Sequence, residues 1–154
     1  MNDARSPGAC CGNAYNERVY TMQVQTPAHD AWVEITERVA ERIRAAAFDA
    51  GAILVYVPHT TAGVTLNENA DPDVVADMRR QLASMVPWTQ PFYAHGEGNS
   101  AAHVKASMMG HSVTVPVSGG RMALGTWQGI HLCEFDGPRQ RRVCLCPLAA
   151  APPG

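Results

Sequence analysis

Five consecutive apolar residues, Ile53 to Val57, constrain the fold of this chain more than any other segment. Successive side chains of a strand point to opposite faces, so a continuous apolar run rich in β-branched residues is typical of a strand buried on both faces. The polar residues His59, Thr60 and Thr61 follow directly after it. We therefore expect a central strand in a layered domain, with polar side chains gathered at its end.

The rest of the chain predicts an α+β fold, a mostly antiparallel sheet sandwich with two longer helices and one short helix. Asp30 and Asp71 are expected to cap the two longer helices, with Gly51 stopping the first and Pro87 the second. Asn99 or Ser100 would begin the short helix, which stops at Gly110. Alternation or short apolar runs predict further strands at 18–25, 64–67, 112–117, 121–124, 127–135 and 140–146. The last four should be antiparallel neighbours joined at 118–120 and 136–138.

Length and composition fit one domain, which we place at residues 15–146, with disordered tails at 1–14 and 147–154. A formal net charge of −2 argues against nucleic acid as the main partner. No apolar stretch approaches the roughly 20 residues that span a bilayer, so we expect no membrane association and a cytoplasmic location. The five cysteines match no disulfide or zinc pattern and are expected to be reduced.

His59, His95 and His103 each lie beside acidic, amide or hydroxyl residues in turn-rich segments. Imidazole is a common metal ligand and titrates near neutrality, so the three could hold a divalent metal (Zn or Mg) or move protons. Glu68 could act with them as ligand or general base, because Asp71 already caps the following helix. Alternatively, each histidine is a hydrogen-bonded structural group.

Phosphate is a second ligand that these segments suit. Thr60 and Thr61 offer hydroxyl groups, and the expected helix start at Asn99 and Ser100 offers free N–H groups. Lys105, the only lysine of the chain, could add a positive charge. The alternative is that the threonines turn the chain, Ser100 caps a helix and Lys105 is solvated.

The segment 125–142 carries further candidates. Thr126, Gln128 and Glu134 could line a pocket, while Trp127 and Phe135 pack in the core or between subunits. A cluster of arginines follows, and it could meet phosphate or the carboxylates of a neighbouring subunit, or lie on a solvated edge strand: Arg139, Arg141 and Arg142.

Taken together, these motifs resemble the YjbQ-like family, often labelled secondary thiamine-phosphate synthase. The resemblance runs from about Trp32 to Val143. It rests on Val57-Pro58-His59-Thr60-Thr61-Ala62-Gly63-Val64, Asn67-Glu68-Asn69-Ala70-Asp71-Pro72-Asp73, His95 with Glu97-Gly98-Asn99-Ser100, Ala102-His103-Val104-Lys105, and Gly125-Thr126-Trp127-Gln128 with Glu134 and Asp136-Gly137-Pro138-Arg139. It implies a sandwich-like domain assembled as a homotrimer, with sites near subunit boundaries. It also implies the joining of hydroxymethylpyrimidine diphosphate to thiazole phosphate with release of pyrophosphate.

Two functions follow as hypotheses, an enzyme acting on a phosphorylated small molecule or a non-catalytic trimeric module that binds a metal or phosphometabolite. A purely structural trimer is a third. For the enzyme, the candidate catalytic residues are Glu68, His103 and Lys105, and the candidate metal ligands are His59, His95 and His103. The candidate substrate-binding residues are Thr60, Thr61, Asn67, Asn99, Ser100, Thr126, Gln128 and Arg139.

Overall fold

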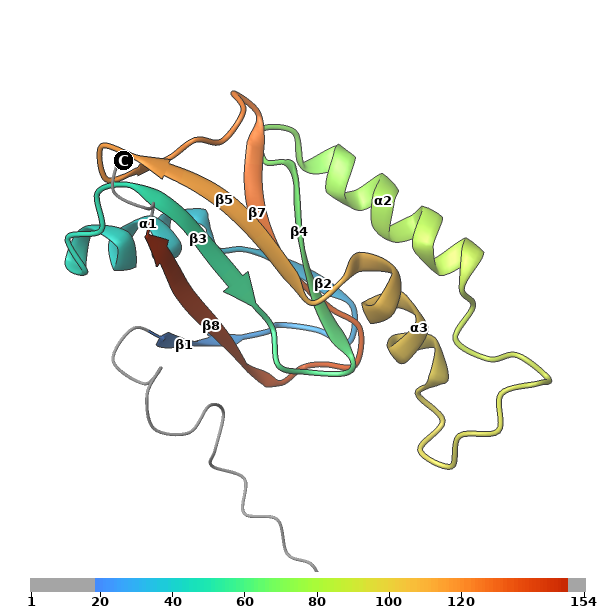
Figure 1. Cartoon of the computed structure of the whole chain (residues 1–154). Coiled ribbons are helices and arrows are strands. Elements are labelled where there is room, and N and C mark those ends of the chain that lie inside the picture. The colour runs from blue at the N-terminus through green and yellow to red at the C-terminus, as the bar shows by residue number, and fades with distance from the viewer. Residues whose placement is uncertain (1–18, 150–154) are drawn as a thin grey trace, which may run out of the picture.

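The computed structural model of the chain describes residues 19–149, which form two antiparallel sheets and three helices (Figure 1). The strands are β1 Tyr20–Gln25, β2 Ala31–Glu34, β3 Gly51–Tyr56, β4 Ala62–Glu68, β5 Ser112–Ser118, β6 Arg121–Met122, β7 Gln128–Glu134 and β8 Gln140–Ala149. The helices are α1 Thr36–Ala45, α2 Pro72–Met85 and α3 Ser100–Met109. This confirms the predicted α+β sandwich of mostly antiparallel strands.

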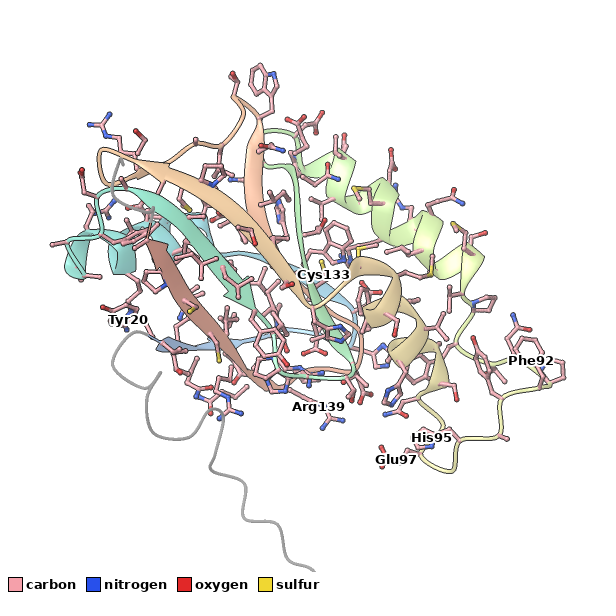
Figure 2. The ribbon with its side chains drawn as sticks, in the orientation of Figure 1. Tyr20, Phe92, His95, Glu97, Cys133 and Arg139 are labelled. Carbon is pink, nitrogen blue, oxygen red and sulfur yellow. The ribbon has the colours of Figure 1, made fainter. Side chains whose placement is uncertain are left out.

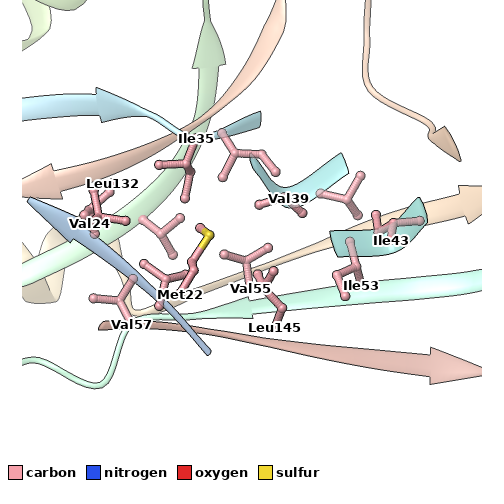
Figure 3. Close-up of a cluster of buried hydrophobic side chains, with 14 of the residues drawn as sticks. Met22, Val24, Ile35, Val39, Ile43, Ile53, Val55, Val57, Leu132 and Leu145 are labelled. Carbon is pink, nitrogen blue, oxygen red and sulfur yellow. The ribbon is translucent and has the colours of Figure 1, made fainter. Parts of the chain in front are cut away.

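The main core lies between the two sheets. The larger sheet has the order β1-β8-β3-β5-β6 and the smaller one the order β2-β7-β4. Valine, isoleucine and leucine side chains from both sheets meet there, and Val39 and Ile43 of α1 close one side of the cluster (Figure 3). Removal of this apolar surface from water is the main stabilising contribution to such a sandwich.

A second, smaller core lies on the other face of the three-stranded sheet, under α2 and α3. Cys133 and Phe135 pack there with Leu82 of α2 and Ala102 and Ala106 of α3. The central strand β7 is therefore apolar on both faces, with Ile130 and Leu132 in the main core. The molecule is thus three layers deep, and α3 is held directly beside the end of β7.

The first helix begins later than the sequence suggested. Asp30 does not cap it, and Trp32 lies in strand β2, paired with Cys133 of β7. Pairing with β7 outweighs the helical spacing of Trp32 and Ile35, so α1 has ten residues and only α2, with fourteen, is longer. The turn after α1 is made by Ala47, with φ at 48°, and Gly51 begins β3 instead of stopping the helix.

The C-terminal strands also differ from the expectation. β7 and β8 do not pair with each other, because the segment 136–139 carries the chain from the smaller sheet to the larger one. β8 continues to Ala149, so residues 147–149, expected in a tail, belong to the sheet. Pro147 pairs with Ile53 of β3, beyond Leu145, the last residue of β8 that pairs with β1 among the described residues. The expected tails 1–14 and 150–154 lie outside the described residues.

Other predictions are confirmed. The side chain of Asp71 accepts a hydrogen bond from the N–H of Asp73, with Pro72 at the first helical position of α2. Residues 86–99 connect α2 to α3, and α3 stops at Gly110 as predicted, in a positive-φ conformation. None of the helices in the described range is long and apolar enough to cross a membrane.

The outer face of the larger sheet is not covered by any described helix or strand. β3 lies at its centre, as predicted, and its residues Ile53 and Val55 are buried in the core. On the opposite face Leu54 is only half-buried, while Tyr56 and Leu148 are about two-fifths exposed at 43% and 44%. We expected β3 to be buried on both faces. Within a single chain only the face that points into the main core is buried.

Candidate functional site

A buried ion pair between Glu134 and Arg141 forms the base of the candidate site. Glu134 is fully buried at the end of β7, and Arg141 is almost fully buried at the start of β8. Two bonds join them, from Nη2 to Oε1 at 2.5 Å and from Nε to Oε2 at 2.6 Å. The other Nη2 contact reaches the hydroxyl of Thr61 at 2.8 Å. Thr61, which was predicted to bind substrate, is thus a buried residue whose hydroxyl accepts a hydrogen bond from Arg141.

Backbone and side-chain donors complete the coordination of Glu134. The N–H groups of Phe135 and Asp136 donate to Oε1, and the hydroxyl of Thr26 donates to Oε2 at 2.9 Å. Burial raises the pKa of Glu134, but these donors and the charge of Arg141 outweigh it and hold that pKa below its ordinary value. The carboxylate is therefore ionised and fully satisfied at neutral pH.

The turn after β7 links this ion pair to the surface. Asp136 accepts a hydrogen bond from Arg139 Nη2 at 2.7 Å and one from Asn99 Nδ2 at 3.1 Å. Arg139 also donates from Nε to the Asp136 carbonyl, and about half of its side chain is exposed. An exposed guanidinium is therefore held in a defined place beside the start of α3.

The start of α3 brings two of the predicted histidines together. The His95 and His103 ring centroids are 5.4 Å apart in an edge-to-face arrangement. Asn99 precedes the helix, but its side chain does not cap it; instead Nδ2 contacts Asp136 and, at 3.4 Å, Glu97. Its buried Oδ1 has no hydrogen-bond partner among the described residues. His95, Glu97 and Arg139 lie on the same side of the molecule, near the start of α3 (Figure 2).

His59 approaches the same region from the end of β3. Its Nε2 accepts a hydrogen bond from the backbone N–H of Arg142 at 2.8 Å, which leaves Nδ1 as the protonated nitrogen of the neutral ring. Burial, followed by the charges of Arg141 and Arg142, lowers the pKa of His59. We call the region of His59, Asn99, His103, Asp136 and Arg139 the histidine end of the smaller sheet. Thr60 lies exposed beside it, and Ser100 is half-buried at the first position of α3.

Lys105 is placed differently from its predicted role. Its side chain is 8% exposed and lies under α3, with Nζ 3.8 Å from Asp30 and 6.0 Å from the centre of the Phe135 ring. Asp30 Oδ1 also accepts a hydrogen bond from Arg79 Nε of α2 at 2.6 Å. In a single chain Lys105 therefore joins α3 to α2 and to the segment before β2.

Four candidate residues lie at the opposite end of the smaller sheet, which we call the Glu68 end. The pairing of β4 with β7 sets Glu68 opposite Gln128 at one end and Ala62 opposite Glu134 at the other. At a strand rise of about 3.3 Å per residue, the two ends are on the order of 20 Å apart. The side-chain oxygens of Asn67 and Gln128 accept hydrogen bonds from nearby backbone N–H groups, those of Glu68 and Gly125. Thr126 is exposed there, so one chain does not bring Asn67, Glu68, Thr126 and Gln128 to the histidines.

The three histidines do not form a ready-made metal site. Within residues 19–149, no group of three His, Cys, Asp or Glu side chains is arranged to hold an ion. His59 is engaged by Arg142, while His95 and His103 are adjacent. The expectation of a divalent metal therefore stays a prediction, with His95 and His103 as the pair that could share it.

Comparison with known proteins gives the family. The family model described as "UPF0047 protein YjbQ-like" matches residues 20–149, nearly the whole described chain. The chain belongs to the YjbQ-like UPF0047 family. It is 50% identical to the UPF0047 protein YugU of Bacillus subtilis over 121 residues, which cover 79% of this chain and 92% of that protein. It is 44% identical to the UPF0047 protein MJ1081 of Methanocaldococcus jannaschii, over 80% of this chain and 88% of that one.

Solved structures of the family have the same fold. A crystal structure of a family protein from Clostridium acetobutylicum is 43% identical, with a TM-score of 0.81, covering 84% of this chain and 99% of that one. The conserved hypothetical protein TT1486 of Thermus thermophilus is 39% identical, with a TM-score of 0.79 and the same coverage. The sandwich described above is therefore the fold of the UPF0047 family.

Sequence reasoning found most residues of the histidine end but missed how they are connected. Glu134 and Arg141 were noted as a pocket residue and a member of a basic cluster, not as partners. A signal was present for Glu134, because it lies between the apolar residues Cys133 and Phe135, where a buried charge requires a partner. Thr26 and Asp136 carried no comparable signal, since both lie in turns where such residues are common.

Proposed function

We propose that the chain is a cytoplasmic small-molecule enzyme that acts on a phosphorylated substrate at the histidine end. One observation carries this proposal: hydrogen bonds join four separate segments, 59–61, 95–103, 134–142 and Thr26, either at the buried Glu134–Arg141 pair or at the residues next to it, Asp136 and Arg142. A buried ion pair is costly to desolvate and contributes little net stability, so its presence under a polar surface favours a positioning role.

The donors around this surface suit phosphate. Arg139 presents a guanidinium whose orientation Asp136 fixes, and the N–H groups of Ser100 and Ala101 at the start of the ten-residue helix α3 precede its first bond, from Ala102 N–H to the Asn99 carbonyl. Thr60 adds an exposed hydroxyl, and the neutral His59 can donate from Nδ1. These groups would bind a phosphate ester and stabilise negative charge that develops on it during reaction.

The specific reaction that we propose is thiamine phosphate formation, which the family resemblance implies. In that reaction the bond between the pyrimidine methylene carbon and the pyrophosphate oxygen breaks, with its electron pair leaving on pyrophosphate. A bond from that carbon to the thiazole nitrogen forms. The task for the protein is to stabilise the departing pyrophosphate, and Arg139 with the start of α3 is suited to it. His103 is proposed to donate a proton to the departing pyrophosphate oxygen.

A divalent metal, zinc or magnesium, is proposed as a cofactor near His95 and His103. Imidazole suits zinc better than magnesium, and two histidines supply only part of a four-coordinate shell. A bound ion would supply Lewis-acid stabilisation of a phosphate oxygen. The roles given above to Arg139, His59 and His103 do not depend on it.

We propose a homotrimer as the assembled form. The support from this chain is the uncovered face of the larger sheet, where half-buried or exposed apolar side chains lie on adjacent central strands: Ala52, Leu54 and Tyr56 of β3 with Cys146 and Leu148 of β8. A strand that is apolar on both faces is usually buried on both. Contact with further copies of the chain would cover this face, and His59 and Arg142 lie at its edge.

A second candidate is a module that binds a metal or phosphometabolite without turnover. The placement of Glu68 and Lys105 favours it, because both proposed catalytic groups lie away from His103 in a single chain. This candidate shares the ligand and the site of the first and differs only in the absence of chemistry.

The test is a turnover assay on tag-free protein, with hydroxymethylpyrimidine diphosphate and thiazole phosphate, with and without added Zn²⁺ or Mg²⁺. We expect thiamine phosphate in proportion to enzyme, reduced at least about tenfold in His103→Ala. His111→Ala is the matched control and should keep full activity. Absence of product under every condition would refute the synthase proposal, and a substrate-dependent rise in melting temperature without product would favour the binding module.

A further inference from the structure

A cavity lies between helix α1 and the β5–β6 hairpin, away from the histidine end. Its volume is about 670 Å³, within the range of small-molecule sites. In Figure 1, α1 and α3 lie on opposite sides of the sheets, so this cavity is separate from the proposed phosphate site. Its lining comes from residues 36–49 and 119–124.

The floor of the cavity is apolar. Phe48, Met122 and Leu124 are half-buried, so part of each side chain faces the open space. Ile43 lies beneath them and is 2% exposed. These side chains also pack against the main core, which fixes their positions. Such a floor favours a ligand with an apolar group.

The rim carries one free charge of each sign. Asp49 and Arg121 both line the cavity, and neither side chain has an ion-pair or hydrogen-bond partner among the residues that the structure describes. The other arginine of the lining, Arg44, is already paired with Glu37 at 2.6 Å. A ligand that carried only a negative charge would meet the Asp49 carboxylate, so the rim favours a zwitterion.

The cavity wall also contains an unfavourable backbone conformation. Ala47 has φ at 48°, in the left-handed region that costs a residue with a Cβ roughly 1 kcal/mol. Among the described residues, Ala47 is the single non-glycine residue with a positive φ. It lies between α1 and the cavity residues Phe48 and Asp49. This conformation closes the C-terminus of α1, where the N–H of Ala47 bonds the Arg44 carbonyl and the N–H of Phe48 bonds the Ile43 carbonyl, and it thereby sets Phe48 and Asp49 in the cavity lining.

We propose that this cavity binds a free α-amino acid with a large apolar side chain. The ammonium group pairs with Asp49, the carboxylate pairs with Arg121, and the side chain packs on Phe48, Met122 and Leu124. The site is separate from the histidine end, and the proposal does not depend on the proposed enzyme activity.

Calorimetric titration of the full chain with L-phenylalanine tests this inference, with L-leucine as a second probe. Two analogues separate the charges: 3-phenylpropanoate lacks the ammonium group, and 2-phenylethylamine lacks the carboxylate. We expect L-phenylalanine to bind, and each analogue to bind about tenfold more weakly or worse. Asp49→Asn should abolish the preference for L-phenylalanine over 3-phenylpropanoate, and Arg121→Gln should abolish the preference over 2-phenylethylamine.

Arg80→Gln is the matched control, because Arg80 is an exposed arginine that does not line this cavity. It should bind L-phenylalanine as the wild type does. All three substitutions are at exposed positions, so the fold should persist, and melting curves without ligand verify this. Two results would overturn the proposal: no heat with either amino acid, or equal binding by the wild type, Asp49→Asn and Arg121→Gln. Neither result bears on turnover at the histidine end.

Discussion

Arg141 and Glu134 form two charge-assisted hydrogen bonds across the boundary between the two sheets. Glu134 ends β7 of the smaller sheet, and Arg141 lies at the start of β8 in the larger sheet. The segment 136–139 between them carries Asp136 and Arg139. The ion pair therefore fixes the two ends of the turn that supports the proposed phosphate site.

Replacement Glu134→Gln should be strongly destabilising. It leaves the Arg141 guanidinium buried without a carboxylate, and breaking one partner of a buried pair costs about 3–5 kcal/mol. Urea denaturation followed by circular dichroism measures the loss in free energy of unfolding. Combination with Arg141→Met should recover part of that loss, because the uncompensated charge is then removed. A loss below about 1 kcal/mol for Glu134→Gln would contradict the assigned role.

Protonation of His59 should make stability fall as the pH drops below about 6.5. Burial lowers its folded pKa, so between that pKa and the unfolded value the unfolded chain binds more protons and is favoured. The pKa of His131 is lowered too, mainly by burial, and it adds to the same trend. Denaturation midpoints at pH 5.5 to 7.5 should show a shallower slope in His59→Gln than in the wild type. An identical slope in both proteins would show that His59 does not titrate in this way.

Gly63→Ala should destabilise the chain by about 1–3 kcal/mol through overpacking between β4 and α3. A Cβ at this position would lie 2.7 Å from the Gly110 carbonyl oxygen and 2.9 Å from Met109 Cβ. The N–H of Val64 bonds the same carbonyl, so the backbone has little room to move. Gly96→Ala is the control, since a methyl group added at Gly96 would have no atom within 4 Å. Thermal melting of the two variants side by side measures the difference, and equal melting temperatures would refute the close contact.

Leu54→Asp should disrupt assembly while leaving the monomer folded. Leu54 is half-buried on the uncovered face of the larger sheet, so its replacement does not open the main core. A carboxylate at the centre of an apolar contact between copies would be desolvated at high cost. Light scattering during size-exclusion chromatography should give a trimer mass for the wild type and a lower mass for the variant. A wild type that is monomeric would refute the trimer, and an unchanged mass for Leu54→Asp would exclude this face from it.

Much of the fold could be predicted from the sequence because local patterns and tertiary structure agree there. Residues 53–56 of the apolar run lie in the central strand β3, with Val57 directly after it, and the Asp71-Pro72 pair begins α2 as its capping chemistry requires. The segment around Trp32 could not be predicted in this way. Its helical spacing was overruled by pairing with β7, which lies roughly a hundred residues later in the chain.

The candidate site was only partly predictable for a similar reason. His59, Asn99 and Arg139 stand out by their local sequence, and the fold brings them to one end of the smaller sheet. The sequence places both Thr61 and Glu68 next to a strand terminus, but it does not show at which end of the folded sheet each terminus lies. Glu68 ends β4 while Thr61 precedes it, so the two lie at opposite ends of the same strand.

Calorimetric titration with inorganic pyrophosphate tests the proposed phosphate site at the histidine end. The wild type and the Arg80→Gln control should bind pyrophosphate alike, and Arg139→Gln should bind at least about tenfold more weakly, because a charge-assisted contact is lost. Equal binding by Arg139→Gln and the wild type, or no binding by the wild type, would contradict the proposed site.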